Sequence, residues 1–310
     1  MDKFTKTTDQ DRGGATGAPR AEPTGPTDHA GHTDRVSQRS RRWLRVLAIV
    51  GPVLALYVAA FLPAGLSMLL PPLSGDASAG VVVVFVVVQS LVVCLIAIGL
   101  CAVLVRIHGL RLRDAGLRWT RTSGLSLLLG LAVGAVVLLG VGVLLTAAQV
   151  LRPGADFGLP WWALVSAGLA QALFLQGFPE ELLFRGYQMT ALRARPAVAL
   201  VISSAVFAVM HLSSRGGQEN ALERVLYLAM PFGFAIAAGA LMILTGSLWA
   251  AVGVHAGLHV GSLIGVLYGL GNGPLLWVLG GALYTLIGLG LLAVARRRGQ
   301  LDGIWSGPVR

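Results

Sequence analysis

Eight long apolar runs constrain this chain more than any other feature of its sequence. They cover residues 44–62, 81–105, 125–145, 161–185, 196–214, 225–244, 248–267 and 275–294. As an α-helix, an apolar run of about 20 residues spans the hydrocarbon core of a bilayer. Of the 310 residues, 55% are apolar and 12% are charged, too few charges for an ordinary soluble domain. The sequence therefore predicts an all-α fold, a polytopic membrane helix bundle of about eight transmembrane helices.

The distribution of lysine and arginine predicts how these helices are oriented, because cytoplasmic connections carry an excess of both. Residues 1–45, 106–121, 185–195 and 296–310 would lie on one side, and they hold twenty-one of the twenty-four basic residues. The other side holds only Arg152, Arg215 and Arg224. Both termini are therefore expected in the cytoplasm. The net charge of +10 is then a topology signal, so the expected partner is the lipid bilayer and not nucleic acid.

Composition divides the chain into three expected segments. Residues 1–40 contain almost no large apolar side chains and are expected to form a disordered cytoplasmic tail. Residues 41–298 are expected to form the transmembrane helical bundle, and residues 299–310 a short cytoplasmic tail. The chain has two lysines against twenty-two arginines, which is typical of a high-GC bacterium. A multi-pass protein of the inner (plasma) membrane of a bacterium is therefore expected.

The fourth apolar run contains two adjacent acidic residues. Of fourteen acidic residues, only Glu180 and Glu181 fall inside an apolar run. A charged group at the centre of a membrane helix costs about 2.5–3.5 kcal/mol, so the pair indicates a functional site. Arg185 shares a helix face with Glu181 and can neutralise it, whereas Glu180 is rotated by about 100°. We predict a chemically active Glu180 beside a supporting ion pair, and an ion pair that only holds the fold is the alternative for Glu181 and Arg185.

Three histidines lie in later apolar runs, and their spacing predicts that they meet the glutamates. If the chain turns near Pro196, Glu180 and His211 lie at about the same distance from that turn, roughly 22–24 Å at 1.5 Å per residue. His255 and His259 are four residues apart and share one helix face. A desolvated glutamate can activate water near neutral pH, while imidazole N–H groups stabilise the oxyanion of an attacked amide. The alternative for a lone histidine is a hydrogen bond between helices.

Three motifs occur in order between residues 161 and 267. They are Glu180-Glu-Leu-Leu-Phe-Arg185, Phe207-Ala-Val-Met-His211, and Thr245-Gly-Ser-Leu-Trp249 leading to His255. Together they resemble the motifs of the CPBP family, which comprises CAAX proteases and bacteriocin-processing enzymes and is also called Abi. The resemblance implies an eight-helix intramembrane glutamic endopeptidase. In it Glu180 activates water with His211, while Glu181 and Arg185 support the site.

The resemblance also implies that His255 helps to form the oxyanion site. The family usually has Asn four residues after this histidine, where this chain has His259. A neutral imidazole can still donate one hydrogen bond. No cofactor is expected, because the resembling family normally has Asn at the position of His259, and Asn is a poor zinc ligand. If a metal such as zinc is present, its ligands are expected to be Glu180, His211, His255 and His259.

The expected activity is hydrolysis of a membrane-associated protein or peptide near the cytoplasmic side of the membrane. Two other functions stay open from the sequence. One is a non-proteolytic membrane scaffold or immunity-type protein that keeps the motifs for binding. The other is a proton-coupled transporter in which Glu180 and the histidines form a relay.

Overall fold

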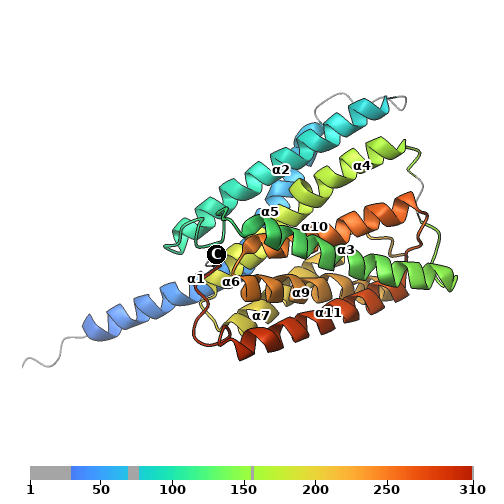
Figure 1. Cartoon of the computed structure of the whole chain (residues 1–310). Helices are drawn as coiled ribbons and strands as arrows, with labels where there is room; N and C mark the ends of the chain where they lie inside the picture. The colour runs from blue at the N-terminus through green and yellow to red at the C-terminus, as the bar shows by residue number, and fades with distance from the viewer. Residues whose placement is uncertain (1–28, 69–76, 155–156, 309–310) are drawn as a thin grey trace, which may run out of the picture. The chain divides into compact units, whose positions relative to one another are not determined.

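The computed structural model describes residues 29–68, 77–154 and 157–308 (Figure 1). Within these ranges the chain is helical and forms no strand, which confirms the all-α class. Eight helices are long and apolar enough to cross a membrane, as predicted. Of the predicted disordered tail, residues 1–28 lie outside the described ranges, and residues 29–40 belong to the first helix. Residues from Arg42 onward form one compact unit, the bundle described below.

The helix bounds follow the apolar runs closely. The α-helices are α1 (His29–Ser67), α2 (Ala79–Ile107), α3 (Ser123–Ala147), α4 (Trp161–Ala170), α5 (Phe178–Glu181), α6 (Met189–Ala191), α7 (Pro196–Met210), α8 (Ala221–Tyr227), α9 (Ala229–Thr245), α10 (Leu248–Leu267) and α11 (Pro274–Arg297). Two π-helical segments, η1 (Gln171–Gly177) and η2 (Leu182–Gln188), join α4, α5 and α6 into one continuous span, and η3 (His211–Ser213) is a short 3₁₀ turn. This fourth span runs to Ala191, beyond its predicted end at Arg185. Arg185 is therefore a buried helix residue and not one of the loop charges that indicate orientation.

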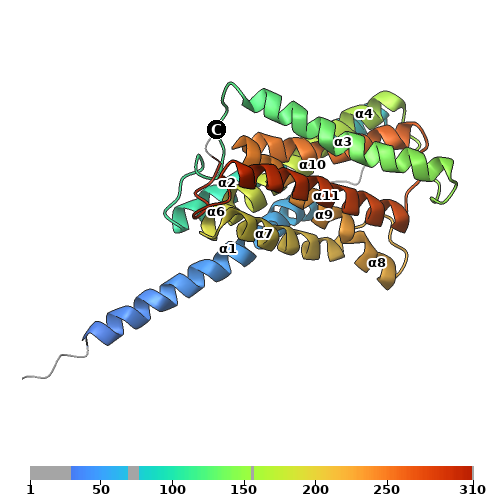
Figure 2. The same ribbon diagram turned by 60° about the horizontal axis from the view of Figure 1, so that its bottom comes forward.

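Helix α9 lies at the centre of the bundle. It packs against α7, α10 and α11, and nearly all of its side chains from Met230 to Ile243 are buried. Figures 1 and 2 show α9 running among these three helices. On another side of the bundle, α2 packs against α4 and η1. The fourth span therefore lies between α2 and α10, where both can contribute side chains to a site around the glutamates.

Helices α3 and α10 approach so closely that their backbones touch. A Cβ atom added to Gly130 or Gly134 would collide with carbonyl oxygens of α10, and one added to Gly253 or Gly257 would collide with carbonyl oxygens of α3. Small residues allow this approach in membrane bundles.

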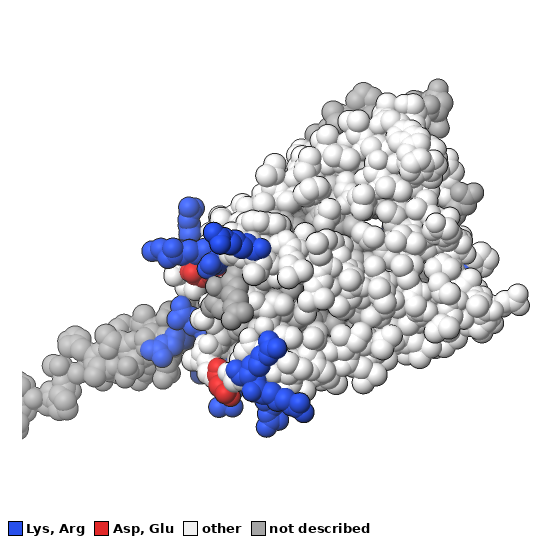
Figure 3. Space-filling view, viewed as in Figure 1, with Lys and Arg blue, Asp and Glu red and all other residues white. Residues whose placement is uncertain are grey.

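Basic side chains gather at one end of the bundle. Figure 3 shows arginine side chains concentrated there on the face in view, and the rest of that face carries hardly any charge. These side chains come from the end of α2, the connection between α2 and α3, and the end of α11: Arg106, Arg111, Arg113, Arg118, Arg121 and Arg296 to Arg298. No bilayer accompanies the protein, so the cytoplasmic orientation of this end stays a prediction. The segment from residue 299 packs against the bundle, since the Trp305 N–H donates to Ala194 O at 2.8 Å.

Three connections meet in a polar cluster that contains Arg152. The Arg152 guanidinium forms ion pairs with Glu219 and with Glu223, the latter at 2.9 Å. Its hydrogen bonds to Glu223 and Glu219, of which the one to Glu223 has the larger effect, raise the pKa of Arg152 above its ordinary value. The Arg152 backbone exchanges two hydrogen bonds with Asn272. The segments before α4, before α8 and before α11 are thus tied together.

We expect the substitution Gly134→Val to destabilise the protein by about 1–3 kcal/mol, because the added side chain would overpack the contact of α3 with α10. The measurement is thermal unfolding in detergent. Gly140→Val is the matched control, because Gly140 lies on the same helix and a Cβ there meets nothing within 4 Å. An equal loss of stability in both variants would contradict the close approach of the two helices.

Candidate active site

The two glutamates lie between the π-helical segments η1 and η2. Pro179 has no N–H, so it cannot bond the carbonyl four residues back, and a regular α-helix is interrupted there. Immediately before it, the Phe178 N–H instead bonds Leu173 O, five residues back. Such π-helical turns are frequent at functional sites, where they change the direction of neighbouring side chains. Glu180 is 8% exposed and Glu181 is 0% exposed.

Glu181 and Arg185 form the predicted ion pair. Arg185 Nη1 lies 3.2 Å from Glu181 Oε1, and Arg185 Nε lies 3.2 Å from Glu181 Oε2. The Arg185 guanidinium also lies 4.5 Å from the centre of the Phe207 ring, a cation–π contact. Both charged side chains are fully buried. The pair thus joins η2 to α7 in the interior of the bundle.

His255 contacts both glutamates and His259. Its Nδ1 lies 2.9 Å from Glu181 Oε1, and its Nε2 lies 3.9 Å from Glu180 Oε2 and 3.1 Å from His259 Nε2. A carboxylate paired with arginine only accepts hydrogen bonds, so Nδ1 of His255 donates to Glu181. In a neutral imidazole Nε2 is then an acceptor, and the proton between the two rings belongs to His259. Glu181 therefore sets the tautomer of His255.

His211 directly follows α7 and faces the same cavity as Glu180. Its Nδ1 lies 2.8 Å from Phe207 O, a carbonyl that can only accept, so Nδ1 donates and Nε2 of the neutral ring is left as an acceptor. Glu180, His211, His255 and His259 line one cavity of about 470 Å³. Among the described residues Glu180 and His211 share no direct hydrogen bond. Glu180 and His211, which were predicted to lie at the same distance from the turn near Pro196, therefore line one cavity but do not contact each other.

Sequence reasoning missed several polar residues of this cavity. Tyr57, Gln89, Gln176 and Tyr227 also line it, from α1, α2, η1 and α8 respectively. The sequence prediction rested on charged residues and histidines inside apolar runs, and these amides and phenols belong to neither group. An uncharged polar side chain inside an apolar run also indicates a functional site, although less strongly than a charged one. Gln89 in the very apolar α2 is the clearest case.

The side chains suggested as alternative zinc ligands do not form a metal site here. Within the part of the chain that the structure describes, no group of three or more His, Cys, Asp or Glu side chains is placed to hold a metal ion. Nδ1 of His255 is also occupied by Glu181. We derive no catalytic step through a metal. Metal dependence stays open to experiment.

Comparison with known proteins bears on this part of the chain. Residues 159–261 match the family model described as type II CAAX prenyl endopeptidase Rce1-like. These residues form an Rce1-like domain of the CPBP family. The match contains Glu180, His211 and His255, one residue from each motif, and it confirms the resemblance. The chain is thus a multi-pass membrane protein with an Rce1-like CAAX protease domain. No match was found among curated proteins or among solved structures.

We expect Glu181→Gln to destabilise the protein by about 3–5 kcal/mol, because it leaves the buried Arg185 guanidinium unpaired. The measurement is denaturation in detergent, monitored by the loss of the helical circular dichroism signal. Removing both charges with Glu181→Gln and Arg185→Met should cost less than the two single losses added together. Glu180→Gln is the matched control, because among the described residues Glu180 forms no ion pair with Arg185 and lies 3.9 Å from Nε2 of His255. Equal destabilisation by both glutamate substitutions would contradict the division of roles.

Proposed function

We propose that the protein is an intramembrane endopeptidase that hydrolyses peptide bonds of a membrane-associated protein or peptide. One observation carries the proposal: the acidic residue of the first motif and the histidines of the second and third line the same cavity. The family match supports a peptidase independently of this geometry. A cavity of about 470 Å³ lies within the range of substrate-binding pockets in proteins.

In the proposed reaction Glu180 acts as general base on a water molecule in the cavity. The water oxygen attacks the carbonyl carbon of the scissile amide while one of its protons passes to the Glu180 carboxylate. Nε2 of His211 accepts the other O–H of this water and orients it. Glu180 then gives its proton to the leaving nitrogen as the C–N bond breaks. The products are a carboxylic acid and an amine, and no covalent enzyme intermediate forms.

The oxyanion of the intermediate requires a hydrogen-bond donor, and we assign this role to His259. In the resembling family an Asn is usual at this place, and its amide is a donor. Nε2–H of His259 points to His255 in the structure and would turn to the oxyanion when substrate binds. His255, held by Glu181, would then be a positioning residue for His259. This refines the role expected for His255 from the resemblance.

The site lies nearer the basic end of the bundle than the opposite end. His255 is seven residues from Leu248, the first residue of α10, or about 10 Å at 1.5 Å per residue. If the basic end faces the cytoplasm, cleavage occurs near the cytoplasmic side. We infer a bacterial plasma membrane as the location from the composition and the basic connections.

We expect Glu180→Gln to lower the cleavage rate by about 10²–10⁴-fold, because the amide cannot accept a proton from water. The assay uses purified protein in liposomes and a library of quenched fluorogenic membrane peptides. Each reaction is run with and without a chelator. Failure of the unmodified protein to cleave any peptide would overturn the proposal. Activity that is lost with chelator and restored by zinc would overturn the metal-free mechanism.

We expect His259→Ala to lower kcat by about 10²–10³-fold, as the loss of one oxyanion donor does in other hydrolases. His259→Asn should retain far more activity, because it restores a neutral N–H donor at the same place. Comparing kcat and KM for the two variants on one cleaved peptide checks this. Equal activity of the Ala and Asn variants would refute the donor role.

A further inference from the structure

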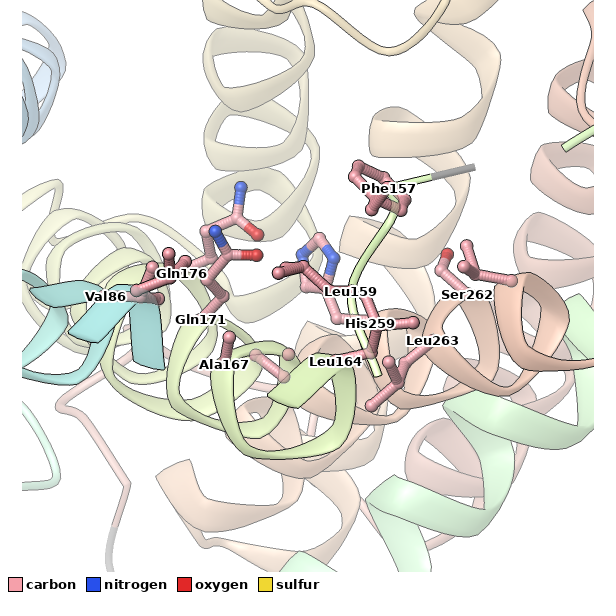
Figure 4. Close-up of a pocket in the computed structure, with 14 residues that line it drawn as sticks. Val86, Phe157, Leu159, Leu164, Ala167, Gln171, Gln176, His259, Ser262 and Leu263 are labelled. Carbon is pink, nitrogen blue, oxygen red and sulfur yellow. The ribbon is translucent and has the colours of Figure 1, made fainter. Parts of the chain in front are cut away.

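A second cavity adjoins the proposed active site. It has a volume of about 290 Å³ and lies among α2, α4, η1, α10 and the segment before α4. Figure 4 shows this cavity, which we call the glutamine pocket. His259 and Gln176 line both cavities, so the glutamine pocket opens beside the proposed oxyanion donor.

The glutamine pocket combines apolar walls with unpaired amides. Val86, Leu164 and Leu263 are among its apolar lining residues. Figure 4 shows the amide ends of Gln171 and Gln176 directed into the pocket, toward the imidazole of His259. Within the described residues neither glutamine side chain makes a hydrogen bond. Gln171 and Gln176 both belong to the fourth membrane span.

Gln171 is exposed and Gln176 is half-buried, so an occupant of the pocket can reach both amides. Accessible, unpaired amides inside a membrane span indicate a ligand with matching groups. Polar side chains in membrane helices normally hydrogen-bond across helices, because an unpaired polar group in an apolar environment is unfavourable. A primary amide offers two N–H donors and a carbonyl acceptor. A peptide backbone offers the complementary acceptor and donor. A lipid acyl chain offers neither, and the pocket lining contains no Lys or Arg for a phosphate group.

Cleavage inside a membrane creates a need for such partners. A peptide bond must leave its helix to be attacked, and its neighbours then lose their backbone hydrogen bonds. Gln171 and Gln176 stand next to His259 and can replace these bonds on one side of the scissile bond. Gln89, which lines the main cavity and also makes no side-chain hydrogen bond among the described residues, offers a third amide there.

We propose that the glutamine pocket binds an extended apolar segment of the substrate adjacent to the scissile bond. Gln171 and Gln176 hydrogen-bond its backbone, and an aliphatic side chain of the substrate packs against the leucines of the pocket. The proposal rests on the proposed function, because it places this segment beside the reacting bond. It adds substrate-binding residues that lie outside the three motifs.

The test measures binding without cleavage. The probes are fluorescein-labelled peptides with a central run of Leu, Val or Ala flanked by lysines, and the protein carries Glu180→Gln throughout. Fluorescence anisotropy in detergent gives Kd. Adding Gln171→Met or Gln176→Met should weaken binding by about fivefold each, the effect of one lost hydrogen bond. Gln149→Met is the matched control and should leave Kd unchanged, because Gln149 lines neither cavity.

A backbone substitution in the peptide separates hydrogen bonding from packing. Replacing one amide of the best-bound probe by an ester removes a single N–H. If the replaced amide is the one that contacts Gln171, the ester should raise the Kd for the protein that retains Gln171. It should not change the Kd for the Gln171→Met variant, which has already lost this hydrogen bond. Unchanged or tighter binding by both Met variants would overturn the proposal and favour an apolar or lipid occupant. Failure of all probes to bind would also overturn it.

The two proposals fail in different ways. Glutamine-dependent binding by a protein that cleaves nothing would leave the pocket standing and overturn the peptidase. Cleavage whose KM is unaffected by Gln171→Met and Gln176→Met would overturn the pocket and leave the peptidase standing.

Discussion

The buried carboxyl group of Glu181 connects the parts of the site that come from different helices. It pairs with Arg185 on its own helix and accepts a hydrogen bond from His255 on α10. Arg185 in turn lies over Phe207 of α7, four residues and about one helical turn before His211 of the second motif. A charge in the interior of a membrane bundle is tolerated only with such partners. Because His255 also contacts His259, the fold and the proposed chemistry both depend on this carboxylate.

The surrounding packing makes this arrangement rigid. Glycines let α3 and α10 touch along their backbones, which holds the helix that carries His255 and His259. Gly186 has a similar role in the fourth span, because a Cβ there would collide with Ala115 O of a basic connection. Glu180 is then free of strong partners and faces the cavity. The residue proposed to exchange protons is thus the one that the packing leaves unpaired.

The sequence predicted the membrane class, the eight spans and the residues that converge on the site, because charges in apolar runs are rare enough to be informative. The ion pair of Glu181 and Arg185 followed from their spacing on a helix. The contact of His255 with Glu181 did not, since it depends on how α10 packs against the fourth span. The π-helical turns were also missed, because they follow from the local response to Pro179 and not from apolar periodicity. Gln171 and Gln176 were missed since an uncharged amide hardly alters the hydropathy of a run.

The polar cluster around Arg152 bears on how a substrate reaches the cavity. It joins three connections that are distant in sequence, and separating them would break two ion pairs and two backbone hydrogen bonds. By contrast, the walls of both cavities include side chains of α2, a helix that buries only a small part of its surface in the bundle. A substrate that enters the cavities from the bilayer would therefore disrupt less packing on the α2 side than on the side of the tied connections.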